Sequence, residues 1–114
     1  MKRLIVSLVL AQAFLISNAI AENKKGQEIF EAKGCAICHK VDIDAIGPSL
    51  KTIGEHYLGK EGSLLAYLKG QGTPIVDPAR AAVMNPQLIK IRSLFEDEMN
   101  ALAEHMVSAN DRPF

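Results

Sequence analysis

Two cysteines and a histidine stand together in this chain, as Cys35, Cys38 and His39 of the pentapeptide CAICH. Residues three apart lie on one side of a helical turn, so both thiols can face the same flat object. Haem carries two vinyl groups that thiols can attack to form thioethers, and C-x-x-C-H is the signature of that attachment. The adjacent imidazole can then bind the iron as an axial ligand. The motif therefore predicts one covalently bound haem c.

Three other uses of the cysteines compete with haem attachment. A zinc site would need four ligands, and although Cys35, Cys38, His56 and His105 could supply them, there is no second clustered pair. A redox dithiol of the thioredoxin kind needs a βαβ setting, and the sequence shows no strand pattern. A local disulfide would close a loop too small to stabilise the fold. Haem attachment is the favoured interpretation.

The start of the chain has the order typical of an export signal. A positive start at residues 2–3 precedes an apolar run over residues 4–16 and an A-x-A pattern at residues 19–21. We therefore expect residues 1–21 to be a cleaved signal peptide and residues 22–114 to form one domain in the periplasm. An uncleaved membrane anchor is the alternative, but a spanning helix needs about 20 apolar residues and this run is shorter.

Size and charge limit what the mature chain can do. Removal of 21 residues from 114 leaves 93, and the loss of two basic residues leaves 11 against 13 acidic ones, a net charge of −2. That balance does not suit a nucleic-acid binder. We expect no stable membrane insertion after cleavage, because no second long apolar run exists. A chain this short can bury only a small hydrophobic core, so we expect something other than disulfides, such as the haem, to supply the rest of the core.

The sequence predicts helices and no strand, so we expect an all-α domain of about four or five helices, and the cysteine motif adds one haem to it. Helices are expected over residues 24–33 after an N-cap at Asn23, over 49–57, and from 62 or 63 to 69 with Gly70 as a stop signal. For the last helix, Ser93 and Glu96 predict a capping box. Its apolar positions trace one stripe, comprising Phe95, Met99, Leu102, Ala103, Met106 and Val107.

A second axial ligand would come from the candidates Met84, Met99, Met106, His56 and His105. Met99 and Met106 belong to the core stripe, where packing is the simpler role. His56 lies in a charged stretch typical of the surface, and His105 lies beside the stripe, where it can pack at a helix crossing. Met84 is favoured, and a loop anchor is its alternative role.

The segment that carries Met84 supports this choice. Prolines at positions 74, 78 and 86 prevent one long helix over residues 70–93, and a loop of that length is uncommon unless it has a function. Asp77 and Pro78 have the pattern of an N-cap and a first helical residue, so a short turn over residues 79–82 is expected before the methionine.

Pro48 is the candidate that orients the histidine. A ligating imidazole needs an acceptor for its other ring nitrogen, which sets the tautomer and the ring angle. Pro48 has a carbonyl oxygen and follows His39 closely enough for the chain to loop back beneath the ring. Ordinary turn chemistry of Gly47-Pro48 is the alternative.

Taken together, these segments resemble the small bacterial class I c-type cytochromes with one haem. The resemblance covers residues 26–30, 33–39 and 46–50, Met84, and the helix over 101–106. The last helix of that family often carries Trp or Tyr near the position of His105, so we expect a differently packed crossing.

The resemblance implies an all-helical fold in which the first and last helices cross. It implies thioethers from Cys35 and Cys38, axial ligands His39 and Met84, and a Pro48 carbonyl bonded to the histidine. It also implies haem attachment after export, in agreement with the leader.

The function expected is electron transfer without catalysis, by a monomer that shuttles single electrons between redox proteins of the periplasm. Lysines 33, 40, 51, 60 and 69 could ring the haem edge and steer acidic partners, or could form an ordinary solvated surface. A second hypothesis is a cytochrome subunit of a periplasmic redox enzyme complex, for example in sulfur-compound oxidation or delivery to an oxidase. A third is a haem sensor with an open sixth position.

Overall fold

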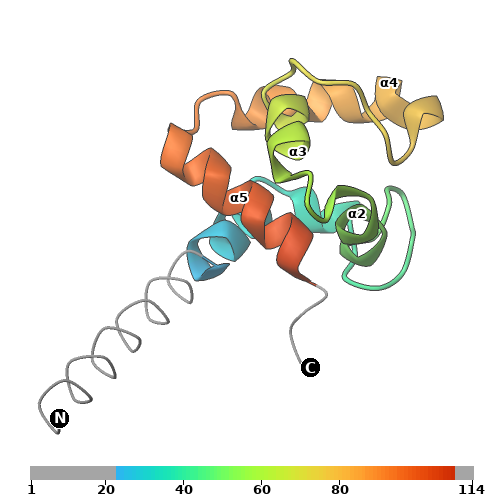
Figure 1. Ribbon diagram of the computed structural model, residues 1–114, viewed down its shortest axis with the longest axis horizontal. Coiled ribbons are helices and arrows are strands. Elements are labelled where there is room, and N and C mark those ends of the chain that lie inside the picture. Colours follow the sequence, from blue (N-terminus) through green and yellow to red (C-terminus); the bar gives the residue numbers. More distant parts are fainter. Residues whose placement is uncertain (1–22, 110–114) are drawn as a thin grey trace, which may run out of the picture.

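The computed structural model describes residues 23–109, which form helices and short helical turns joined by loops, with no strand in this part of the chain (Figure 1). The predicted signal peptide lies outside the described residues. None of the described helices is long and apolar enough to cross a membrane. The all-α prediction is confirmed. In chain order the elements are a helix over 23–32, the 3₁₀ turn η1 (Cys35–Ile37), α2 (Leu50–Tyr57), α3 (Glu61–Leu68), the 3₁₀ turn η2 (Pro78–Arg80), α4 (Ala81–Met84), the 3₁₀ helix η3 (Asn85–Ile91) and α5 (Glu96–Ser108).

The first described helix crosses α5, as the family resemblance implied (Figure 1). Gly26 makes the close approach possible, because a Cβ there would lie 2.7 Å from the Cβ of His105 and would also meet the Ala101 carbonyl. One turn later Phe30 packs edge-on against the His105 ring, with centroids 5.3 Å apart. The histidine thus occupies the crossing, in agreement with the different packing that we expected there.

Helix α5 organises the core, since it contacts both α2 and α3. The predicted stripe is buried from Met99 to Val107. Phe95 is the exception, because it is 75% exposed. It adopts an extended conformation as the residue before the first turn, so its side chain does not follow the helical stripe.

The start of α5 corrects the predicted capping box. Ser93 lies in the turn that follows η3, and the N-cap position is Phe95. Glu98, three residues on, accepts a hydrogen bond from the Phe95 N–H at 2.8 Å. The acidic half of a capping box is therefore present, displaced by two residues from the prediction. A phenyl ring cannot supply the other half.

The other helix ends follow local signals. Ser49 caps α2, and its hydroxyl accepts from the Thr52 N–H at 3.0 Å. Gly70 follows α3 with φ of 78°, a left-handed conformation suited to glycine. Asn23 is already helical, so the predicted N-cap is wrong there. Its side-chain oxygen instead accepts from the Ser108 hydroxyl at 3.2 Å.

The segment between α3 and α5 is a series of short helical turns, not one helix, as its prolines predicted. Residues 71–77 are irregular, and η2, α4 and η3 then follow one another directly. Pro78 stands at the start of η2 as expected. Asp77 precedes it, but its side chain makes no capping bond.

Candidate functional site

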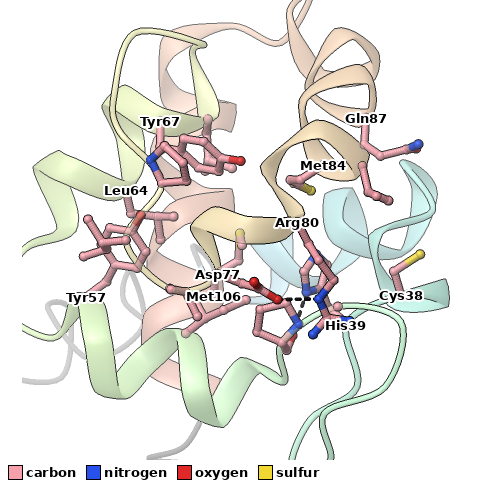
Figure 2. Close-up of a pocket in the computed structure, with 18 of the residues that line it drawn as sticks. Cys38, His39, Tyr57, Leu64, Tyr67, Asp77, Arg80, Met84, Gln87 and Met106 are labelled. Atoms are coloured by element: carbon pink, nitrogen blue, oxygen red, sulfur yellow. Dashed lines mark hydrogen bonds and ion pairs between the residues drawn. The ribbon is translucent and has the colours of Figure 1, made fainter.

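A cavity opens between the turn carrying Cys38 and His39 on one side and helices α2 and α3 on the other (Figure 2). Together with the open solvent at its mouth it encloses about 810 Å³. Tyr57, Leu64 and Tyr67 form one wall, and Met84 lies opposite on α4. The lining is mostly apolar, which suits a flat hydrophobic ring system.

His39 is buried at this cavity and is held in one orientation. Its Nδ1 lies 2.6 Å from the Pro48 carbonyl oxygen. A carbonyl can only accept, so Nδ1 carries a proton and Nε2 is the ring nitrogen left to bind a metal. The predicted Pro48–His39 contact is therefore present, and it prepares Nε2 to bind a metal.

Gly47 lies flat against the same ring, a role that the sequence analysis did not assign. A Cβ at this position would lie 2.7 Å from His39 Cε1 and 3.0 Å from Nδ1. Those distances are shorter than ordinary contacts, so the site requires glycine here. The signal was a glycine directly before the proline that orients the ring.

The two cysteines lie on a tight turn that begins after Gly34. The amides of Cys38 and His39 both bond to the Cys35 carbonyl, at 3.2 and 3.0 Å. Both thiols are free. Cys38 lines the cavity, whereas Cys35 is half-buried against the hydrophobic core. Burial raises the pKa of the Cys35 thiol, although the nearby Lys90 ammonium opposes this.

The competing uses of these cysteines find no support in the structure. Within residues 23–109, no three His, Cys, Asp or Glu side chains gather closely enough to hold a metal ion such as zinc. The described chain also lacks the strands that a thioredoxin-like setting needs.

Two methionines reach the cavity. Met84 is half-buried at the end of α4, and Met106 of α5 contributes to the lining although it is a core residue. Met99 is buried in the core. His56 is exposed, with Nδ1 2.8 Å from the Thr52 carbonyl oxygen, and His105 lies in the helix crossing. Met84 and Met106 are therefore the thioethers that remain.

Two tyrosines connect this cavity to the segment that carries Met84, and neither was a sequence candidate. Burial raises the pKa of both Tyr57 and Tyr67. Tyr57 also takes a backbone hydrogen bond from Ile75, and the Tyr67 hydroxyl donates to Asn85 Oδ1 at 3.4 Å. Only the tertiary fold reveals them, because no local pattern distinguishes them from core residues.

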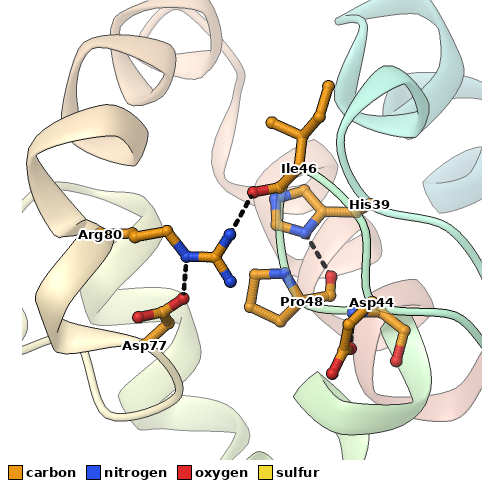
Figure 3. Close-up of polar contacts among 7 residues, drawn as sticks. His39, Asp44, Ile46, Pro48, Asp77 and Arg80 are labelled. Atoms are coloured by element: carbon orange, nitrogen blue, oxygen red, sulfur yellow. Dashed lines mark hydrogen bonds and ion pairs between the residues drawn. The ribbon is translucent and has the colours of Figure 1, made fainter.

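A polar contact crosses the cavity between two segments far apart in the chain (Figure 3). Arg80 Nη1 donates to the Ile46 carbonyl at 2.9 Å, and Arg80 Nε donates to Asp77 Oδ2 at 2.5 Å. Asp44 lies on the other side of Pro48, where its carboxylate accepts from the Ser49 N–H at 2.8 Å.

The lysines predicted to ring the site have different surroundings. Lys40 donates to the Ala36 carbonyl at 3.0 Å and so lies on the cysteine turn. Lys69 forms an ion pair with Glu96 of α5 at 2.7 Å. A steering role for the five lysines stays a prediction.

The donor set fits a covalently bound haem. Two free thiols share one turn, a buried imidazole has its Nδ1 bonded to a carbonyl, and a thioether lines the same apolar cavity. These are the groups that thioether attachment and His/Met ligation require.

Comparison with known proteins agrees with this geometry. A family model described as cytochrome c matches residues 23–110. A cytochrome c-551 from Stutzerimonas stutzeri is 31% identical over 110 residues, covering 94% of this chain and 96% of the relative. A cytochrome c-551 from Pseudomonas aeruginosa is 24% identical over 104 residues, covering 91% and 93%. One from Azotobacter vinelandii is 37% identical over 51 residues, covering 42% and 62%.

Proposed function

Because this chain belongs to the cytochrome c family and is an electron-transfer haem protein with one covalent haem c, we propose that it shuttles single electrons between redox proteins of the periplasm. The observation that carries the proposal is His39, fixed by the Pro48 carbonyl at a cavity that Met84 also lines. When bound, the haem iron alternates between two oxidation states, and no bond in the protein has to form or break.

Each residue of the site has a proposed role. Cys35 and Cys38 would form the thioethers, and His39 would bind the iron through Nε2. Pro48 fixes the imidazole by accepting from Nδ1. Met84 would supply the second ligand to the iron, and a Met/His pair raises the reduction potential. The apolar walls of α2 and α3 exclude water, which leaves little solvent to reorganise when the charge of the site changes.

Replacement of Met84 tests the ligand set. Met84→Ala should abolish the sulfur-to-iron charge-transfer band of the oxidised protein and lower its reduction potential. Met106→Leu is the matched control, because Met106 lines the same cavity but belongs to the core. This control should retain the band. Loss of the band in the Met106 variant, with the band intact in the Met84 variant, would indicate that Met106 is the ligand and Met84 is not.

Replacement of the cysteines tests the attachment. With both Cys35 and Cys38 changed to Ala, acid–acetone should extract the haem, whereas the natural protein should retain it. Haem that stays with the double variant would contradict thioether attachment.

The mass of the purified protein tests both the proposed cleavage of the signal peptide and the attachment of haem. Residues 1–21 should be removed on export, leaving residues 22–114 as the haem domain. The purified protein should have the mass of residues 22–114 plus one haem. A mass that includes the leader would overturn the proposed cleavage and support a membrane anchor.

The second candidate function is a subunit of a periplasmic redox complex. It draws on the segment carrying Met84, where Val83 and Ile89 are each about 60% exposed. A free monomer in the soluble periplasmic fraction supports the shuttle, and a stoichiometric complex supports the subunit. Rapid carbon monoxide binding to the reduced protein would instead indicate an open sixth position, as in a haem sensor.

A further inference from the structure

Arg80 joins two segments that approach the cavity from opposite sides. It lies in η2, four residues before Met84 and in the same run of helical turns. Its guanidinium reaches the carbonyl of Ile46, 34 residues away in sequence, at 2.9 Å (Figure 3). Ile46 is two residues before Pro48, whose carbonyl holds His39. One side chain thus connects the segment of the proposed thioether ligand to the segment that orients the imidazole.

Asp77 determines where this guanidinium points. Its carboxylate accepts from Nε at 2.5 Å, which leaves the Nη1 donor directed at Ile46. A planar guanidinium can serve both acceptors at once, whereas an ammonium cannot match that fork. Arg80 and Asp77 also line the cavity. Arg80 is 53% exposed, so the ion pair by itself stabilises the fold little, and its effect is on geometry.

The contact is well placed to control Met84. The Met84 segment consists of short turns. Of its two contacts with tyrosines, the one beside Met84, between Tyr67 and Asn85, is long at 3.4 Å, and the one between Tyr57 and Ile75 lies before η2. Short 3₁₀ and α turns have little stability of their own, so tertiary contacts decide where they lie. The Arg80–Ile46 bond is such a contact, and it lies one helical turn from the thioether.

We propose that Arg80, oriented by Asp77, is a positioning residue that clamps the Met84 segment to the His39 side of the cavity and keeps the thioether in place. This inference rests on the proposed ligation by Met84. The clamp acts by lowering the population of a form in which Met84 has moved away.

Imidazole binding to the oxidised holoprotein measures that population. An external ligand competes only when Met84 has left the iron, so its apparent Kd falls as the dissociated fraction rises. We expect Arg80→Ala to lower the apparent Kd for imidazole about fivefold, which corresponds to about 1 kcal/mol. Arg80→Lys should recover less than half of this effect, because one ammonium cannot replace both bonds.

Two controls separate the clamp from a general loss of stability. Lys69→Ala removes a comparable ion pair, Lys69–Glu96, that lies outside the cavity lining, and it should leave imidazole affinity unchanged. In a Met84→Ala background, Arg80→Ala should have no further effect on imidazole affinity. An equal effect with and without Met84 would overturn the clamp.

Other outcomes also refute the proposal and differ from a failure of the proposed function. If Arg80→Ala lowers the reduction potential but leaves imidazole affinity unchanged, the guanidinium acts through its charge and not as a clamp. If Lys69→Ala matches Arg80→Ala, the effect is global stability. If Met84→Ala itself leaves the charge-transfer band intact, the ligand assignment fails first, and the clamp fails with it.

Discussion

Gly47→Ala should damage the imidazole side of the site directly. The added Cβ would lie 2.7 Å from His39 Cε1, whereas non-bonded carbon atoms prefer at least about 3.5 Å. The ring and the Gly47-Pro48 segment would therefore have to separate by about 0.8 Å. The ring cannot simply rotate away, because Nδ1 is bonded to Pro48 and Nε2 is the proposed iron ligand.

The cost can be worked from these distances. A separation of about 0.8 Å would stretch the 2.6 Å Nδ1–Pro48 contact to about 3.4 Å, beyond the usual hydrogen-bond limit of about 3.2 Å. Loss of a hydrogen bond costs about 0.5–1.5 kcal/mol, and overpacking a well-filled site costs about 1–3 kcal/mol. We therefore expect Gly47→Ala to lower the free energy of unfolding by about 2–4 kcal/mol.

Urea unfolding of the holoprotein, followed by far-ultraviolet circular dichroism and by haem absorption, measures this change. Gly62→Ala is the matched control, because a Cβ there meets no atom within 4 Å and Gly62 lies in α3. It should leave the protein equally stable or more stable by up to about 1 kcal/mol. A Gly47→Ala protein within about 0.5 kcal/mol of the natural one would refute the steric argument.

Three further variants probe the scaffold. The Ser49 N–H holds the pKa of the Asp44 carboxyl below its ordinary value. The ionised carboxylate therefore stabilises the fold above its ordinary pKa, and this stabilisation is lost as the pH falls through the lowered pKa of the folded state. Asp44→Asn should reduce the acid-induced loss of stability that urea titrations detect below about pH 4. Leu102→Ala, at a side chain only 1% exposed, should lower the free energy of unfolding by about 2–5 kcal/mol in the same assay. Gly26→Ala should force the two crossing helices apart at the Ala101 carbonyl and reduce the yield of folded holoprotein, and normal yield and stability would contradict the crossing.

The site was predictable from sequence where its chemistry is local. Cys35, Cys38 and His39 lie within five residues, so one helical turn already decides that they can serve the same ring. The helices were predictable for the same reason, because periodicity and capping act within a few residues. The predictions were wrong at the start of the last helix. Phe95 was expected in its buried stripe and Ser93 at its N-cap, whereas α5 begins at Glu96 and its N-cap is Phe95.

Other parts of the site depend on contacts between distant segments. Met106 has the periodicity of a core residue and yet lines the cavity, and a stripe cannot show which of its members reach an internal space. Asp77 has the pattern of a helix cap, but its carboxylate accepts a hydrogen bond from the Arg80 guanidinium and so orients that side chain. Gly47 has the pattern of a turn residue, and only the position of His39 reveals that a side chain there would not fit.

The sequence by itself thus determined the cofactor, the helical class and the turn that carries the two cysteines, because these follow from interactions between residues close together in the chain. The tertiary structure alone decided which methionines line the cavity with the histidine, how Pro48 and Gly47 hold its ring, and how Arg80 joins its own segment to that of Ile46. The physical reason is that these depend on distances across the fold, and hydrophobic periodicity says which face of a helix is buried but not which residue it meets.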